Sequence, residues 1–311
     1  MSIVAEVPGI LQLLSDGSVK RFPLPTTAAS DEFSDGYKTK DVVIDSAKPI
    51  TARIFVPDTG DDLHRLPVLM HFHGGGFCIC STTWLPFHAY LGGVCVKSQV
   101  LIVSVDYRLA PEHKIPTPYD DCHSSLQWLA SNACGGEPWL GRADLSRVFL
   151  SGESAGANIV HHVMLRVARD GVEEGLNIRG LMIIHPYFGS EERIESELAE
   201  GMEAPLAKSD LFWRLSLPEG SDRDHWASNF EKTAADAEGL WQRFPAVAVF
   251  IAGMDLLKER GIMYAEFLRS KGLAVDVVVA EGQEHAFHLL NHDSDDALLL
   301  QSQMADFMNK H

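Results

Sequence analysis

The sequence predicts an α/β protein built on a mostly parallel central sheet with helices on its faces. Short runs rich in Val, Ile and Leu alternate along the chain with longer segments that carry apolar residues at helical spacing. Such alternation is typical of parallel sheets, because parallel strands need a long crossover, usually a helix, between them. The 311 residues, 46% of them hydrophobic, can bury a sizeable core, and we expect a single domain over 1–311.

Six apolar runs and four helical patterns make up this alternation, and an earlier pair of runs predicts an antiparallel hairpin that joins the sheet. The hairpin runs are KDVVID (40–45) and TARIFVP (51–57). The later strands are expected at PVLMHFH (67–73), LIVSVDY (101–107), RVFLSGE (147–153), GLMIIHP (180–186), AVAVFIAG (246–253) and AVDVVVAEG (274–282). The helices are expected at 119–131, 156–169, 257–271 and 295–309.

Two segments, about 1–38 and 190–243, fall outside the alternation. The second mixes acidic runs with Phe212 and Trp213, and it interrupts the series of strands instead of ending it. We therefore expect a helical cap, formed by the N-terminal segment and this insertion. It would lie over the carboxyl edge of the sheet, where α/β proteins bind ligands.

The charge and the cysteines narrow the class of ligand and the compartment. A net charge of −17 argues against binding to nucleic acid or an anionic membrane, because both need clustered Lys and Arg. No apolar run approaches the roughly 20 residues that span a bilayer, and the N-terminus lacks the pattern of a secretory signal. The five cysteines are odd in number and lie in or beside apolar segments, which favours free thiols and a cytoplasmic location.

The stretch GESAG (152–156) places a serine between an expected strand and an expected helix. This G-x-S-x-G pattern, in that setting, is typical of a strained turn that exposes a nucleophile, here Ser154, at the edge of the sheet. The N-terminus of the following helix would point at developing negative charge. The alternative is a glycine-rich turn with an incidental serine.

A serine nucleophile needs a base and an orienting acid, which this architecture supplies in the order Ser, Asp, His. Asp255 follows the strand at 246–253 and His285 follows the strand at 274–282. Asp255 also suits the start of the next helix, and the two roles are compatible. Asp106 precedes Ser154 and so has the wrong order, and His288 is the rival of His285. The neighbouring acids Glu153 and Glu284 are expected to point away from the triad.

The stretch HFHGGGFCIC (71–80) raises three alternatives. After a strand, HGGGF is typical of the oxyanion-binding loop of lipases and esterases, whose backbone N–H groups act together with that of the residue after the nucleophile, here Ala155. A phosphate loop would need a Lys that is absent at that spacing. Zinc could use His71, His73, Cys78 and Cys80, and this is a weaker alternative than the oxyanion-binding loop. We expect no metal and no cofactor.

Together with VDYRLAPEHKIPTPYDD and the GMDLL and EHAF stretches, these motifs resemble the plant carboxylesterases of the hormone-sensitive-lipase-like class over nearly the whole chain. The resemblance implies an α/β-hydrolase fold with an N-terminal and an inserted cap. It also implies an oxyanion hole at Gly75, Gly76 and Ala155 and a triad of Ser154, Asp255 and His285. The family more often has Asp where this chain has Glu153.

The expected function is hydrolysis of a small, largely apolar ester or lactone through an acyl-enzyme. GILQLLSDGSV, PYFGSEER and FWRLSLPEGSDRDH look most like the strigolactone-hydrolysing members of the class. Phe77, Phe212 and Trp213 are candidates for the substrate wall. The alternatives are a hormone receptor built on a hydrolase scaffold and a dehydratase or cyclase of specialised metabolism. The small-molecule ester is the expected partner, and the protein is expected to be a monomer or a homodimer.

Overall fold

The computed structural model describes residues 1–62, 64–133, 135–233 and 237–311. In these ranges the central sheet has eight strands in the order β11-β10-β9-β8-β6-β7-β5-β4. Six neighbouring strands, β11, β10, β9, β8, β6 and β7, run parallel to one another, whereas β5 pairs antiparallel with both β7 and β4. The mixed, mostly parallel sheet and its leading hairpin are therefore confirmed. The strands are β4 (Tyr37–Asp45), β5 (Ile50–Pro57), β6 (Leu66–Phe72), β7 (Leu101–Asp106), β8 (Ala143–Glu153), β9 (Ile178–Ile184), β10 (Ala246–Ala252) and β11 (Val275–Ala280).

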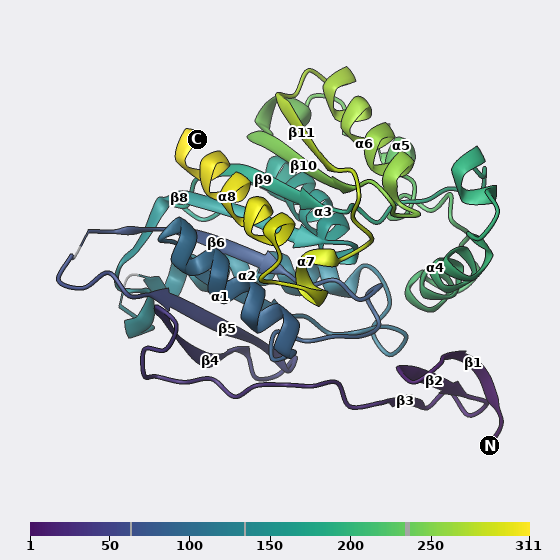
Figure 1. Ribbon diagram of the computed structural model, residues 1–311, viewed down its shortest axis with the longest axis horizontal. Coiled ribbons are helices and arrows are strands. Elements are labelled where there is room, and N and C mark those ends of the chain that lie inside the picture. Colours follow the sequence, from purple (N-terminus) through teal and green to yellow (C-terminus); the bar gives the residue numbers. More distant parts are fainter. Residues whose placement is uncertain (63, 134, 234–236) are drawn as a thin grey trace.

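Helices cover both faces of this sheet, as Figure 1 shows. On β6, Leu69 belongs to the core layer beneath α1 and α8, whereas Val68 and Met70 belong to the layer beneath α2, α3 and α6. Successive side chains of a strand point to opposite faces, so each strand feeds both layers, which explains its continuous apolar sequence. The helices are α1 (Leu85–Ser98), α2 (Thr117–Ala133), α3 (Ala155–Asp170), α6 (Lys258–Ser270), α7 (Phe287–Leu290) and α8 (Asp295–Lys310).

The N-terminal segment differs from the prediction, because it forms strands and not a helical cap. Within residues 3–21, β1 (Ile3–Val7), β2 (Leu11–Leu14) and β3 (Val19–Arg21) make a small antiparallel sheet. The turn between β2 and β3 contains Asp16 and Gly17, and Gly17 has a φ of 83°. A left-handed residue at that position suits a tight hairpin, and Asp-Gly is a strong hairpin signal. The sequence thus carried the information for strands.

The insertion at 190–243 is helical, as predicted. Its main elements are α4 (Glu203–Ser216) and the short α5 (Phe230–Thr233). In Figure 1, α4 and the β1–β3 sheet lie together at one end of the molecule, and residues of β1 and α4 line a common groove. Both segments border the loops that follow β8, β10 and β11, where the site described below lies. In the described residues, no helix is long and apolar enough to span a lipid bilayer.

Candidate active site

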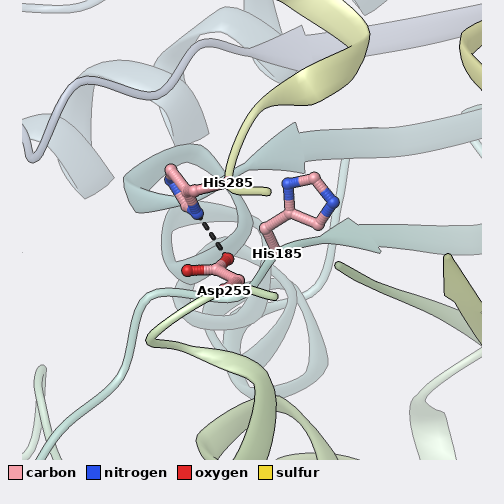
Figure 2. A group of neighbouring side chains, drawn as sticks. All are labelled: His185, Asp255 and His285. Atoms are coloured by element: carbon pink, nitrogen blue, oxygen red, sulfur yellow. Dashed lines mark hydrogen bonds and ion pairs between the residues drawn. The ribbon is translucent and has the colours of Figure 1, made fainter. Parts of the chain in front are cut away.

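A histidine and an aspartate meet at the carboxyl ends of β10 and β11. The Nδ1 atom of His285 lies 2.6 Å from Oδ2 of Asp255, and Figure 2 shows the two side chains pointing toward each other. Burial raises the pKa of Asp255, but the charge and hydrogen bond of His285 outweigh burial and hold it below its usual value. Burial lowers the pKa of His285, but Asp255 outweighs it and leaves that pKa raised. Because Nδ1 donates to Asp255, Nε2 is the nitrogen that can accept a proton.

Ser154 occupies a sharp turn between β8 and α3. Its φ of 52° and ψ of −118° are unusual for a residue with a side chain, and such strain is common at functional sites. The flanking glycines are required by close packing. A Cβ at Gly152 would collide with the Gly156 carbonyl, and a Cβ at Gly156 would collide with the Phe72 carbonyl. The turn brings Ser154 to the same cavity as Asp255 and His285.

The glycine loop after β6 borders the same cavity through Gly75 and Gly76. Both have positive φ values, 101° and 57°, and the Gly75 carbonyl accepts hydrogen bonds from the N–H groups of Cys78 and Ile79. A Cβ at Gly75 would collide with the Ile79 carbonyl. The loop therefore needs glycine, which leaves its backbone close to the cavity. Ala155, the third residue of the expected oxyanion hole, begins α3, so its N–H lies at a helix N-terminus.

The cavity that these groups share has a volume of about 450 Å³. Its wall is mostly apolar and comes from both caps as well as from the sheet. Besides the residues already named, it is lined by Ile10, Ile79, Cys80, Trp84, Glu153, Tyr187, Pro205, Lys208, Ser209, Phe212, Leu256, Leu257, Ala286, Leu289 and Leu290. A serine, a His–Asp pair and a glycine-rich loop around an apolar cavity are suited to acyl transfer on a small ester.

A family model of the alpha/beta hydrolase fold matches residues 69–289, which include every residue of the His–Asp pair, the serine turn and the glycine loop. The chain belongs to the α/β-hydrolase family. Among curated proteins, the chloroplastic tuliposide A-converting enzyme 1 of Tulipa gesneriana is 38% identical, over 98% of this chain and 78% of that protein. Probable carboxylesterase 6 of Arabidopsis thaliana is 36% identical, over 93% of this chain and 85% of that protein. This hydrolase is therefore a plant-type carboxylesterase family member and a serine esterase homologue.

Two further comparisons extend the range of relatives. The 2-hydroxyisoflavanone dehydratase of Glycyrrhiza echinata is 33% identical, over 97% of this chain and 95% of that protein. Among solved structures, the ester-hydrolase EH1AB1 from the metagenome of Lake Arreo is 26% identical with a TM-score of 0.73, over 91% of this chain and 85% of that one. The chain is therefore similar both to esterases and to an enzyme whose name describes a dehydration.

The three aromatic residues expected in the substrate wall of the hydrolase do not all reach the cavity. Phe212 lines it, whereas Phe77 and Trp213 are 0% and 1% exposed and are not among its lining residues. Trp213 stacks on Tyr187, with ring centroids 4.4 Å apart, and Phe77 packs on Trp213 at 5.6 Å. Tyr187 lines the cavity in their place. Phe212 and Trp213 are neighbours on α4 and so point in different directions.

Glu153 does not lie apart from the triad as expected, because it borders the cavity. Its side chain is buried, with Oε2 3.4 Å from Nε2 of His288. Burial raises the pKa of Glu153 to about 8. The charges of His285 and His73 and a hydrogen bond with the Gly74 backbone lower this pKa, but less than burial raises it. Burial likewise lowers the pKa of His288 to about 3. His288 is therefore packed as a neutral ring, and His285 is the histidine that meets Asp255.

His185, which the sequence did not predict as a site residue, is a neighbour of the His285–Asp255 pair. It follows β9, and its Nδ1 accepts a hydrogen bond from the Ala286 N–H at 3.2 Å, while its ring centroid lies 5.5 Å from that of His285. Its place at the carboxyl end of a parallel strand was a signal that could have found it. In the described chain, His185, Asp255 and His285 are the group whose ligand atoms lie close enough to hold a metal ion. Hydrogen bonds already occupy Nδ1 of both rings.

The residues of the alternative zinc site have other partners. Nδ1 of His71 lies 2.9 Å from Oγ of Ser151, and Nδ1 of His73 lies 2.8 Å from the Gly74 carbonyl oxygen. The His73 ring also stacks on Tyr107, whose hydroxyl donates to the His73 carbonyl. These contacts hold the glycine loop in shape. The cysteines Cys78, Cys80, Cys95 and Cys122 are free thiols, and Cys134 lies outside the described residues.

Proposed function

We propose that Ser154, His285 and Asp255 are the catalytic triad of this carboxylesterase, with Gly75, Gly76 and Ala155 as the oxyanion hole. The observation that carries the proposal is the 2.6 Å contact between His285 Nδ1 and Asp255 Oδ2, at the cavity that the strained Ser154 also borders. Asp255 fixes the tautomer of His285, and the raised pKa of His285 makes its ring a stronger base.

In this mechanism, Nε2 of His285 takes the proton of Ser154 as Oγ attacks the ester carbonyl. The tetrahedral oxyanion accepts hydrogen bonds from the backbone N–H groups of the glycine loop and Ala155, each typically worth about 3 kcal/mol in the transition state. His285 then returns the proton to the departing alcohol, which leaves an acyl group on Ser154. Water, activated by the same ring, releases the acid and restores the serine.

Three variants test the triad with p-nitrophenyl acetate. Ser154→Ala removes the nucleophile, so we expect kcat/KM to fall by about 10³-fold or more, and Asp255→Asn by about 10⁴-fold through loss of the correct tautomer. An aryl phosphonate should label the wild type at Ser154, as measured by peptide mass spectrometry. Ser146→Ala, at an exposed serine of β8, is the control and should retain wild-type rates. Wild-type turnover by Ser154→Ala would refute the proposal.

The proposed substrate is a small, largely apolar ester or lactone, with strigolactone-type lactones as the narrower candidate. Support comes from the apolar wall and the volume of about 450 Å³, and for the narrower candidate from the resemblance of the cap segments. A series of p-nitrophenyl esters of increasing acyl length, with a synthetic strigolactone analogue, measures the preference. Turnover of the analogue far below that of simple esters would remove the narrower candidate.

A dehydratase is the second candidate activity, and it is favoured by the likeness to the 2-hydroxyisoflavanone dehydratase. Mass spectrometry of products separates the two reactions, because ester hydrolysis adds water to the substrate whereas dehydration removes it. A receptor with an idle triad is the non-enzymatic alternative, and it requires tight ligand binding without turnover.

A cytoplasmic location is the proposed compartment, although the tulip relative is named as chloroplastic. The free thiols, of which Cys78, Cys95 and Cys122 are buried, support a reducing compartment. Imaging of a fluorescent fusion tests the location. The oligomeric state, monomer or homodimer, stays a prediction.

A further inference from the structure

The helix α4 presents one face to the catalytic cavity. Pro205, Lys208, Ser209 and Phe212 line the cavity, at the spacing i, i+3, i+4 and i+7 that places residues on one side of a helix. Lys208 is the charged residue of these four. It introduces a positive charge into a wall that is otherwise mostly apolar.

Hydrogen bonds fix α4 in this position. The Tyr187 hydroxyl, from the loop after β9, donates to the Ser209 carbonyl at 2.7 Å. On the neighbouring residue Asp210, the carboxylate accepts hydrogen bonds from Arg193 and Arg223 at 2.5 and 2.9 Å. The backbone of Lys208 is thus held beside the cavity by contacts on the two residues that follow it.

Three of the acidic groups around Lys208 have other partners, and the buried Glu153, which lines the same cavity, has its pKa raised to about 8. Asp255 pairs with His285, Asp210 pairs with two arginines, and Glu6, across the groove beside α4, accepts from the Gln12 amide at 3.1 Å. Within the described ranges of the chain, the Lys208 ammonium forms no ion pair.

The charge of Lys208 reaches the catalytic groups. Burial and the Asp255 charge are the main influences on the pKa of His285, and Lys208 acts to lower that pKa. Burial and Glu153 raise the pKa of Cys80, and Lys208 opposes them. A cation that affects both residues lies within electrostatic range of any ester bound between them.

We propose that Lys208 makes this site selective for esters that carry a carboxylate or another anionic group on the acyl or the alcohol part. The inference rests on the proposed esterase function and names its substrate class. An anion in the apolar part of the cavity would lose its hydration without a partner, which is costly, whereas beside Lys208 it gains an opposite charge. The overall charge of −17 repels anions, so a preference for them requires a local cation.

Two pairs of esters test the proposal, one for each side of the scissile bond. Mono-p-nitrophenyl glutarate and p-nitrophenyl pentanoate differ by a carboxylate on the acyl part. In the second pair, p-acetoxybenzoate and its methyl ester differ by a carboxylate on the alcohol part. The measured quantity is the ratio of kcat/KM for the anionic ester to that for the neutral ester, after subtraction of the rate without enzyme.

We expect Lys208→Met to lower this ratio by about five- to tenfold for at least one pair, and Lys208→Glu to lower it further. Lys208→Arg keeps the charge and should preserve most of the ratio. Added salt should reduce the wild-type ratio, because it screens an exposed ion pair. Lys310→Met removes the same charge at the far C-terminal helix α8, where Lys310 pairs with Asp276, and should leave the ratio unchanged.

The outcomes separate this inference from the proposed function. Suppose that the wild type hydrolyses these esters and that both ratios keep their wild-type values in Lys208→Met and in Lys208→Glu. Lys208 is then a solvated surface residue and the inference is wrong. If the wild type hydrolyses none of the four esters, or hydrolyses them no faster than Ser154→Ala does, the esterase proposal itself fails.

Discussion

Single side chains at this site have more than one partner, and Asp255 is the clearest case. Its Oδ2 contacts His285, while its Oδ1 accepts a hydrogen bond from the Leu257 N–H at 3.0 Å, just before α6 begins. Asp255 is not the N-cap of α6, which is Leu257, but its two oxygens contact both His285 and the backbone at the start of that helix. One consequence is rigidity, because the contact with the helix start fixes the carboxylate that orients the imidazole.

Glu153 is a buried acid whose ionisation opposes folding. Burial raises its pKa from 4.5 to about 8, so the folded chain binds this proton more tightly than the unfolded chain does. The stability linked to the proton is fully present below pH 4.5 and is lost as the pH rises through about 8. At 1.36 kcal/mol per pKa unit, the loss has an upper bound of about 5 kcal/mol.

Glu153→Gln should remove this pH dependence. We expect the difference in free energy of unfolding, variant minus wild type, to increase from pH 5 to pH 9, whatever its value at pH 5. Urea unfolding at several pH values measures it. Glu284→Gln, an exposed acid beside His285, is the control and should show no such trend. A pH-independent difference between wild type and Glu153→Gln would contradict the expected burial of the charge.

At the scale of elements, the glycine loop is constrained by two different neighbours. A Cβ at Gly75 would meet the backbone carbonyl of Ile79, whereas a Cβ at Gly76 would meet the ring of Phe212 on α4. Backbone inside a hydrogen-bonded turn moves with difficulty, but a side chain can be removed by mutation. The same loop thus offers a matched pair of substitutions.

We expect Gly75→Ala to reduce kcat/KM for p-nitrophenyl acetate more than Gly76→Ala does. Besides the backbone clash, Gly75 has a φ of 101°, which a residue with a side chain adopts less readily than the 57° of Gly76. Adding Phe212→Ala should recover part of the loss in Gly76→Ala and none in Gly75→Ala. A double-mutant cycle measures the coupling, with the thermal midpoint of each variant as a check on folding. Equal coupling of Phe212→Ala to both glycine variants would contradict the geometry.

The sequence predicted elements well where the pattern depends only on burial. The strands β6 to β11 are apolar on both faces, and their positions were recovered to within a few residues. Helix α1 was not predicted, although its buried side chains Phe87, Tyr90, Leu91, Val94 and Cys95 have the spacing of one helix face. Apolar residues outside that face, such as Leu85 and Val96, and the pair Gly92 and Gly93 obscure the pattern. The N-terminal hairpin was assigned to a helical cap although Asp16 and Gly17 marked its turn. The packing of α4 decides whether Phe212 or Trp213 faces the cavity, and the local sequence does not specify this packing.

For the whole molecule, the proposed catalytic groups lie at the edge of the sheet, and two caps contribute to the cavity wall. The N-terminal sheet contributes Ile10 to the cavity, and α4 contributes the face that contains Lys208. Arg21, at the end of β3, joins the N-terminal sheet to the body of the protein. Its guanidinium donates to the carbonyls of Cys78 and Ala110, at 2.8 and 2.7 Å, and pairs with Glu112.

Arg21→Met should loosen the N-terminal sheet and change substrate binding more than chemistry. Arg21 binds the carbonyl of Cys78, and the N–H of Cys78 in turn donates to the Gly75 carbonyl, so Cys78 links Arg21 to the glycine loop. Hydrogen bonds from a charged donor are typically worth about 1.5 to 3 kcal/mol each. We therefore expect KM for p-nitrophenyl butyrate to rise by about tenfold, with a smaller change in kcat, and limited proteolysis to remove the N-terminal segment sooner.

Lys20→Met is the matched control for this prediction, because it removes the same charge from the adjacent, exposed position of β3. Lys20 lies over the Phe22 ring, 4.7 Å from its centroid, and contacts neither of the carbonyls that Arg21 binds. If Arg21→Met and Lys20→Met gave the same KM and the same rate of proteolysis, the N-terminal sheet would owe its attachment to apolar contacts alone. A selective effect of Arg21→Met would instead mean that one arginine couples the cap to the glycine loop, the proposed oxyanion-binding loop.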